Sequence, residues 1–494
     1  MLYSPLHRRG CLRLPVQLSF LVITMQTRTM PIVCLALWLL LSPFGAAGVC
    51  DTPAEPTPPS LTILCYMNGD NDLANEVLYA LDMMETVGSS DRVNVIALVD
   101  GHPEWLGPYD TTWSRTRLVH LQADPRIGRI TSPVLEEWGE ANMGDPHTLE
   151  RFLRTAMEAY PAEQVYFYIF AHSQGVLDTR DFGPVAPVKT VSMSRDDTSG
   201  EKMPLDDFHQ ALKQGLNGRR FELMVFFSCL ANMVEVDYAM SDVTRYLVGS
   251  QDEIRLVNEP PGRYQIRGMR VEQLISRLKQ TPVADVREVG RALVDSHVDS
   301  YEKAVSLPSG DGAEQTCRFS GGMALVDTAA MPQLVSALDV LAQQLIRDAE
   351  KAGVVQAMRA ALSAAQPFAS FLKMEYYDLL GFVRHLRAAV TEPELETACD
   401  RVLDLMVDRV LVYARHTSDC AATGISIYLS HPLVPDNIFQ THQALYQANR
   451  FSRETQWDEM ISIFRARLKG TLAADLVQLT ATKKGRALST STHP

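Results

Sequence analysis

Five short segments are apolar along almost their whole length and are separated by longer, more polar stretches. They are Leu61–Met67, Val93–Val99, Val165–Phe170, Glu222–Phe227 and Tyr246–Ser250. Apolar runs of strand length are typical of a parallel sheet that is covered by helices on both faces. A further strand is predicted at Arg115–Leu121, and Asp145 with Pro146 predicts a helix start, with Asp as N-cap and Pro in the first position. The sequence therefore predicts an α/β fold with a mostly parallel sheet.

Beyond about residue 270 the pattern becomes mainly helical. Amphipathic runs lie at Val283–Ser300, Ala329–Lys351, Val354–Ala365 and Pro393–Arg415, and two apolar runs, Met323–Val326 and Gly424–Leu429, are candidate further strands. A chain of 494 residues is also too long for one small core. We therefore predict an α/β domain at 61–270, a mainly helical region at 271–470 and a polar tail at 471–494.

The N-terminal segment 1–49 has the pattern of a signal peptide. An apolar run, Pro31–Leu41, follows Arg28 and is followed by the small residues at 45–48. Met25 or Met30 would be a better start than Met1 for such a segment. The proline-rich stretch 50–60 is predicted to be a linker.

The signal segment predicts a secreted, periplasmic or envelope-attached protein. Cys50 is a candidate site for lipid attachment, although a lipoprotein signal favours a small residue where Val49 stands. After removal of the signal, no segment is long and apolar enough to span a bilayer. The net charge of −13 argues against nucleic acid as a partner.

The cysteines do not form a metal-binding pattern. None shows the CxxC spacing of a zinc site, and the sequence requires no cofactor. Disulfides among Cys317, Cys399 and Cys420 are compatible with an exported protein, but the sequence does not define their pairing.

Cys229 and His172 each come directly after a predicted buried strand. The carboxyl ends of parallel strands meet at one edge of a sheet, where active sites of such folds lie. A helix is predicted at Ala231–Tyr246, and its N-terminus would favour the thiolate of Cys229. A Cys–His pair is what nucleophilic acyl transfer needs, although either residue alone is more often structural.

Several motifs, in order, resemble those of the clostripain family of cysteine peptidases, which belongs to the caspase-like clan. They are Tyr66-Met67-Asn68-Gly69-Asp70-Asn71-Asp72-Leu73, Ala171-His172-Ser173, Asp196-Asp197-Thr198-Ser199-Gly200, Cys229-Leu230, Tyr246–Glu253, Tyr377-Asp378-Leu379 and Gly424–Tyr428. The resemblance extends from about residue 61 to 432. It implies a caspase-like fold and a peptide or protein substrate.

The resemblance also implies roles for individual residues. Cys229 corresponds to the nucleophile and His172 to the proton donor, while the backbone N–H groups of Ser173 and Cys229 would hold the oxyanion. Ser173 replaces the usual glycine, and it would be strained if that position needs a positive φ.

The residues that would bind the substrate side chain differ from the family pattern. Phe227 stands in place of the acid that helps to bind a basic residue, and Arg263 lies where a second acid is expected. Cleavage after Arg or Lys is therefore not predicted, unless Asp252 or Glu253 points into the pocket.

Two alternatives remain at the sequence level. Ala171–Gly175 resembles the GxSxG nucleophile elbow of serine hydrolases, which would make Ser173 the nucleophile, but its first glycine is replaced by Ala171 and the residues that follow do not predict a helix. The altered pocket is also compatible with a non-catalytic relative that binds peptides or an envelope partner.

Some members of the family use calcium. Asp70, Asp72, Asp196 and Asp197 are oxygen donors in the corresponding motifs, and they are candidate calcium ligands. The alternative is that these carboxylates only cap turns and helices.

Overall fold

The computed structural model describes residues 60–177, 193–258, 264–266, 268–282, 284–303, 305–308, 314–317, 319–368 and 374–470. The predicted signal peptide, almost all of the linker and the polar tail lie outside these residues, as do Cys50 and Arg263. Nothing in the described part tests them.

The centre of the fold is a nine-stranded sheet with the strand order β17-β14-β9-β8-β5-β1-β2-β3-β4. Its strands are β1 (Leu61–Gly69), β2 (Val93–Gly101), β3 (Thr116–His120), β4 (Val134–Gly139), β5 (Gln164–Phe170), β8 (Phe221–Phe227), β9 (Thr244–Ser250), β14 (Gly322–Asp327) and β17 (Leu411–His416). The five middle strands, β9-β8-β5-β1-β2, are parallel, and the two strands at each edge pair antiparallel. The predicted fold class is confirmed.

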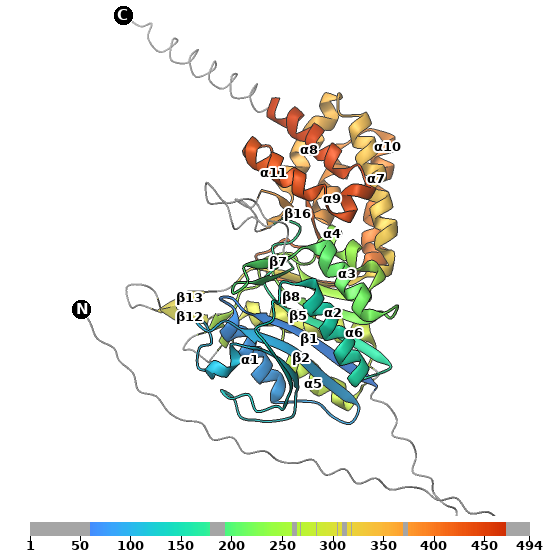
Figure 1. Ribbon diagram of the computed structural model, residues 1–494. Helices are drawn as coiled ribbons and strands as arrows, with labels where there is room; N and C mark the ends of the chain where they lie inside the picture. Colours follow the sequence, from blue (N-terminus) through green and yellow to red (C-terminus); the bar gives the residue numbers. More distant parts are fainter. Residues whose placement is uncertain are drawn as a thin grey trace, which may run out of the picture. The chain divides into compact units, whose positions relative to one another are not determined.

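Helices cover both faces of this sheet, and strand alternation decides which residues face which layer. Ile63 and Cys65 of β1 belong to the core under α1 (Ala74–Glu85), α5 (Val271–Gln280) and α6 (Val286–Glu302). Leu64 and Tyr66 belong to the opposite core, under α2 (Pro146–Ala159), α3 (Leu205–Leu216) and α4 (Val234–Ala239) (Figure 1). Both layers are needed because the strand is buried on both sides.

The predicted start of α2 is confirmed in detail. The Asp145 carboxylate accepts the backbone N–H of His147 at 2.9 Å, and Pro146 occupies the first turn. Asp145 is an N-cap residue, and proline fits where no backbone donor is needed.

The second half of the chain forms a helical layer that shares the core of the α2 side. Its elements are α7 (Met331–Arg347), α8 (Ala352–Ala364), α9 (Leu379–Ala389), α10 (Pro393–Leu405), α11 (Asp436–Tyr446), α12 (Arg450–Glu454) and a small sheet of β15 (Pro367–Phe368), β16 (Tyr376–Asp378) and β18 (Ser426–Tyr428). Three two-stranded ladders complete the described strands: β6 (Ser194–Asp196) with β7 (Glu201–Met203), β10 (Val257–Asn258) with β11 (Tyr264–Ile266), and β12 (Val305–Pro308) with β13 (Glu314–Cys317). The boundary near residue 270 stays a prediction; β14 and β17, which follow it in the chain, belong to the central sheet.

Two predicted helices were too long. The helix predicted at Ala231–Tyr246 is limited to Val234–Ala239, followed by a 3-10 turn at Met240–Asp242, because the chain must re-enter the sheet as β9 at Thr244. The run predicted as helix to Arg415 leaves the helical conformation after Val410, and β17 pairs with β14. In both cases sheet pairing overrides helical periodicity.

Four cysteines whose side chains the structure describes carry free thiols. Cys65, Cys399 and Cys420 are buried, and Cys229 is partly exposed. Because Cys399 and Cys420 are both free, the disulfides considered among Cys317, Cys399 and Cys420 are not formed. In the described part of the chain, each helix is too short or too polar to cross a bilayer.

Candidate active site

The candidate residues come together at the carboxyl edge of the parallel strands. β5 and β8 are parallel neighbours, with Phe170 paired to Phe227, so the segments that carry His172 and Cys229 leave the sheet side by side. β1 lies on the other side of β5 and brings the turn at Asn68–Asp72 to the same edge. The expectation that His172 and Cys229 meet at one edge of the sheet agrees with this pairing.

His172 and Cys229 line one cavity of roughly 280 Å³. His172 is 9% exposed, and Cys229 is partly buried. The backbone N–H of Ile254 donates to Cys229 Sγ at 3.3 Å. The Cys229 thiol also lies 3.8 Å from the carbonyl of Ile254, to which it can donate, so both backbone groups of this residue face the sulfur.

The helix that was expected to activate Cys229 does not begin beside it. α4 starts at Val234 and has only six residues, and a turn separates it from Cys229. In this turn Leu230 has a φ of +53°, a left-handed conformation that residues with a Cβ adopt at a cost. The turn itself and the N–H of Ile254, not a helix dipole, define the surroundings of the sulfur.

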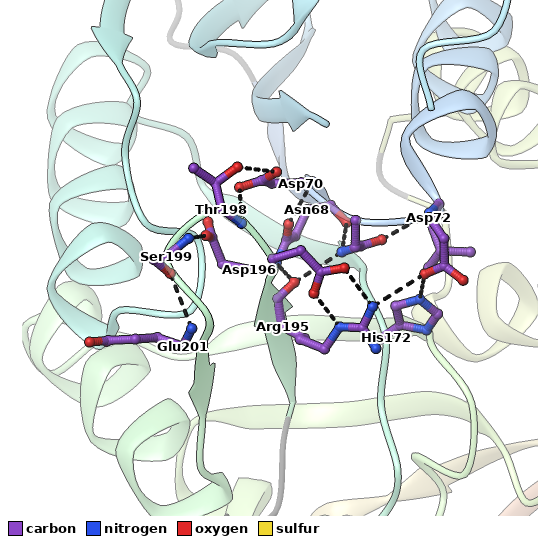
Figure 2. Close-up of polar contacts among 12 residues, drawn as sticks. Asn68, Asp70, Asp72, His172, Arg195, Asp196, Thr198, Ser199 and Glu201 are labelled. Carbon is purple, nitrogen blue, oxygen red and sulfur yellow. Dashed lines mark hydrogen bonds and ion pairs between the residues drawn. The ribbon is translucent and has the colours of Figure 1, made fainter. Parts of the chain in front are cut away.

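His172 is held by a carboxylate. Its Nε2 lies 2.7 Å from Oδ1 of Asp72, in the turn after β1 (Figure 2). The hydrogen bond with His172 lowers the pKa of Asp72 to about 2, and nearby Arg195 acts in the same direction. Asp72 is therefore an anion throughout the physiological range, suited to orient an imidazole and to stabilise its protonated form.

Three acidic residues form a separate cluster next to this pair. Carboxylate oxygens of Asp70, Glu140 and Asp196 all lie within 4.8 Å of one another. Burial, followed by the charge of Asp196, raises the pKa of Asp70 to about 7. Thr198 donates its hydroxyl to Asp70 at 2.9 Å (Figure 2). Oxygen-only donors of this kind are what Ca²⁺ takes.

The four predicted calcium ligands thus separate into two pairs. Asp70 and Asp196 join Glu140, which the motifs did not indicate. Asp72 instead contacts His172, and Asp197 binds Arg195 through both oxygens at 2.6 and 2.7 Å.

Ser173 is fully buried and turned away from solvent. Its hydroxyl accepts the N–H of Gly175 at 3.3 Å and lies 3.9 Å from the sulfur of Met193. Of the described residues with a side-chain Cβ, only Asn217 and Leu230 have a positive φ, so the expected strain at Ser173 is absent. A serine-hydrolase elbow would lead directly into a helix, but residues 173–177 contain none.

Phe227 lies at the wall between this cavity and a smaller one. It lines both, together with Phe170, whose ring meets it edge-on at 4.5 Å between centroids. Glu253 also lines the larger cavity and pairs with Arg255 at 3.2 Å, whereas the Asp252 carboxylate accepts the backbone N–H of Glu253. Arg263 lies outside the described residues, so its position stays a prediction.

Sequence reasoning missed three residues of this region. Asp72 was considered as a calcium ligand or a capping carboxylate, not as the partner of His172. Arg195 was not given a role at the site, and Glu76 of α1, which lines both cavities, was not considered. The order of the strands in the sheet would have placed the turn after β1 next to that after β5, but strand order cannot be obtained from periodicity alone.

Comparison with known proteins identifies the family of this chain. A sequence model of the clostripain family matches residues 65–464. Clostripain from Hathewaya histolytica is 27% identical over 195 residues, which cover 36% of this chain and 35% of that protein. The match therefore spans about a third of the length of this curated relative.

Two solved structures have a similar fold. A secreted C11 cysteine protease from Bacteroides thetaiotaomicron, in complex with an irreversible peptide inhibitor, superposes with a TM-score of 0.54 at 18% identity and covers 82% of this chain and 99% of its own. An inactive zymogen C11 protease from Parabacteroides distasonis superposes with a TM-score of 0.55 at 17% identity. It covers 81% of this chain and 99% of its own. At such identities these structures support the fold alone. The family match, which extends over most of the chain, shows that this protein belongs to the clostripain family.

Proposed function

We propose that the protein is a cysteine endopeptidase that hydrolyses peptide bonds through Cys229 and His172. The observation that supports this most is that both residues line one cavity at the carboxyl ends of adjacent strands, with Asp72 on His172. The substrate is a peptide or protein, and the enzyme acts as a secreted, periplasmic or envelope-attached protein, in keeping with the signal-like segment at 1–49.

In the proposed reaction the Cys229 thiolate attacks the carbonyl carbon of the scissile peptide bond. The backbone N–H groups of Ser173 and Cys229 stabilise the negative oxygen of the tetrahedral intermediate. The carbon–nitrogen bond then breaks as His172 donates a proton to the leaving amine. Water, losing a proton to His172, attacks the thioester, releases the carboxylic acid and regenerates Cys229.

Asp72 holds the imidazole of His172 during both proton transfers. Its contact with Nε2 fixes the orientation of the ring and leaves Nδ1 as the nitrogen that transfers protons in the cavity. Its negative charge stabilises the imidazolium form that donates to the amine. Arg195, anchored on Asp197, lies 3.5 Å from Asp72 and limits the movement of that carboxylate.

The substrate preference that we propose is for a large apolar side chain at the cleaved position, not for Arg or Lys. A desolvated cation needs a carboxylate, and Phe227 stands where the family has one. Phe170, Phe227 and Leu256 line both cavities. Glu76 lines both cavities too, and its carboxylate is the candidate partner for a basic side chain.

Calcium, if bound, would be held by Asp70, Glu140 and Asp196. Its charge would neutralise carboxylates that crowd one another beside the Asp72–His172 pair. No step of the proposed reaction passes through this cluster.

The test is covalent labelling of the mature protein with a thiol-directed peptide inhibitor, followed by mass spectrometry. Labelling at Cys229 and loss of hydrolysis in Cys229→Ala and His172→Ala would support the proposal; Cys420→Ala, which removes another free thiol, is the control. A fluorophosphonate adduct at Ser173 would instead support a serine hydrolase. A protein that forms neither adduct and cleaves no peptide would support the non-catalytic alternative.

A further inference from the structure

The C-terminal half of the chain contacts the turn that carries His172. Tyr376, on β16, is fully buried. Its hydroxyl accepts the backbone N–H of Leu177 at 2.8 Å and donates to the carbonyl of Gln174 at 2.9 Å. About 200 positions along the chain separate these partners, so this is a tertiary contact and not local turn chemistry.

The contacted turn has no regular secondary structure to define its shape. Residues 171–177 form neither a helix nor a strand of the central sheet. Gly175 in its middle has a φ of +69°, and a Cβ there would lie 2.6 Å from Met233 Sδ and 3.2 Å from a ring carbon of Tyr376. The ring of Tyr376 and the turn after Cys229 therefore enclose the turn after His172 from two sides.

The turn after Cys229 is joined to the same C-terminal segment. The side-chain amide of Asn232 donates to the backbone carbonyl of Gly424. The backbone carbonyl of Asn232 accepts the N–H of Ser426 at 3.1 Å. Gln251, at the end of β9, donates to Asp378 at 3.0 Å and accepts the N–H of Gly424 at 2.6 Å. Asn232, Gln251 and Asp378 are fully buried, where hydrogen bonds constrain geometry most strongly.

We propose that Tyr376 is a positioning residue, which fixes the Ser173 N–H, in the turn after His172, relative to Cys229. This inference rests on the proposed peptidase function. A hydrogen-bond donor stabilises an oxyanion only when it is held in place before the reaction, and a small displacement weakens transition-state binding more than substrate binding. Loss of the Tyr376 hydroxyl should then act on kcat.

Tyr376→Phe removes the hydroxyl and keeps the ring that contacts Gly175. We expect kcat to fall by about 10- to 100-fold, the scale of a misplaced catalytic group, with KM changed by less than about threefold. Alkylation of Cys229 by iodoacetamide, which does not use the oxyanion donors, should keep its wild-type rate. Tyr377→Phe is the matched control, because Tyr377 is the buried neighbour on β16 and makes none of these bonds.

The outcomes separate this inference from the proposed function. A wild-type protein that hydrolyses no peptide overturns the proposed function and the inference with it. If the wild type is active and Tyr376→Phe has the same kcat as Tyr377→Phe, the inference is overturned but the proposed function is not. So does a loss of alkylation parallel to the loss of hydrolysis, since that would indicate general disruption of the fold.

Discussion

Nε2 of His172 lies 2.7 Å from Oδ1 of Asp72, although 100 positions separate the two residues in the chain. The contact exists because β1 and β5 are parallel neighbours whose carboxyl ends coincide. It adds a carboxylate to a pair that the motifs present as Cys and His alone, and the role of Asp72 can be tested directly.

Asp72→Asn keeps a side-chain oxygen near the ring but removes its charge. We expect kcat to fall by about 10- to 100-fold, because the carboxylate orients the imidazole and stabilises its protonated form, and loss of a group that orients a functional histidine has effects on this scale. The control is Asp197→Asn, which also alters the surroundings of Arg195 but does not touch His172. Steady-state kinetics on one peptide substrate is the measurement, and equal kcat values for the two variants would exclude the role given to Asp72.

Phe227→Asp places a carboxylate where the family has one. We expect the variant to gain cleavage after Arg and Lys relative to apolar residues, because the new charge compensates a buried cation. A peptide library assayed on wild type and variant measures this. A wild-type profile dominated by Arg or Lys would contradict our proposal, and Glu76→Gln would then show whether Glu76 binds the basic side chain.

Calcium should raise the melting temperature if the acidic cluster binds it, since a ligand that binds only the folded state stabilises it by mass action. Asp70→Asn combined with Asp196→Asn should abolish this shift in melting temperature, because both residues contribute a carboxylate oxygen to the cluster. Asp197→Asn should retain it, because Asp197 pairs with Arg195. Thermal unfolding with and without calcium, in metal-free buffer, measures the shift, and a shift that persists in the double variant would place any bound calcium elsewhere.

Glu235 should make the protein less stable as the pH rises. Burial raises the pKa of Glu235 from 4.5 to about 7, so the folded state binds this proton more tightly than the unfolded state. The free energy of unfolding therefore falls between pH 4.5 and 7, by about 3 kcal/mol for a shift of this size, and then levels off.

Glu235→Gln keeps the acceptor that binds Tyr428 N–H and Tyr446 hydroxyl and removes the titration. Chemical unfolding at pH 5 and pH 8 should show a smaller decrease for the variant than for the wild type. Burial, followed by the charge of Glu235, also raises the pKa of Asp237, so the loss of that charge in the variant weakens this second shift and acts in the same direction. Identical decreases would mean that Glu235 is charged or solvated in the folded state.

Ser173→Ala should leave hydrolysis close to the wild-type rate. The hydroxyl is buried towards Met193, and only the backbone N–H of this residue has a role in the proposed reaction. Inactivity of a folded Ser173→Ala protein, measured beside Cys229→Ala, would return the serine-hydrolase interpretation to consideration.

The sequence predicted the parallel strands well, because a strand buried on both faces has an almost continuous apolar run. It predicted β3 but not its antiparallel direction, which depends on the connection that follows β2. It missed β4, whose Val134 and Leu135 are exposed and leave no apolar pattern. It overextended the helix after Cys229, because pairing of β9 with its neighbours in the sheet ends the helical stretch before Thr244, and a single sequence does not show that pairing.

The candidate site was predicted only where a residue follows a strand directly. His172 and Cys229 satisfy that rule. Tyr376 and Asp378 do not, because they reach the site from about 150 residues further along the chain than Cys229. Such contacts depend on tertiary packing between the two halves, for which one sequence contains no periodic signal.

β14 pairs antiparallel with β9 on one side and with β17 on the other. A protein shortened after residue 270 would retain His172 and Cys229 but would expose β9, whose residues Tyr246–Ser250 are all buried in the full chain. A long apolar edge strand is a template for pairing with other copies. Such a fragment should therefore aggregate during expression, and recombinant production of an active enzyme will need the chain at least through β17.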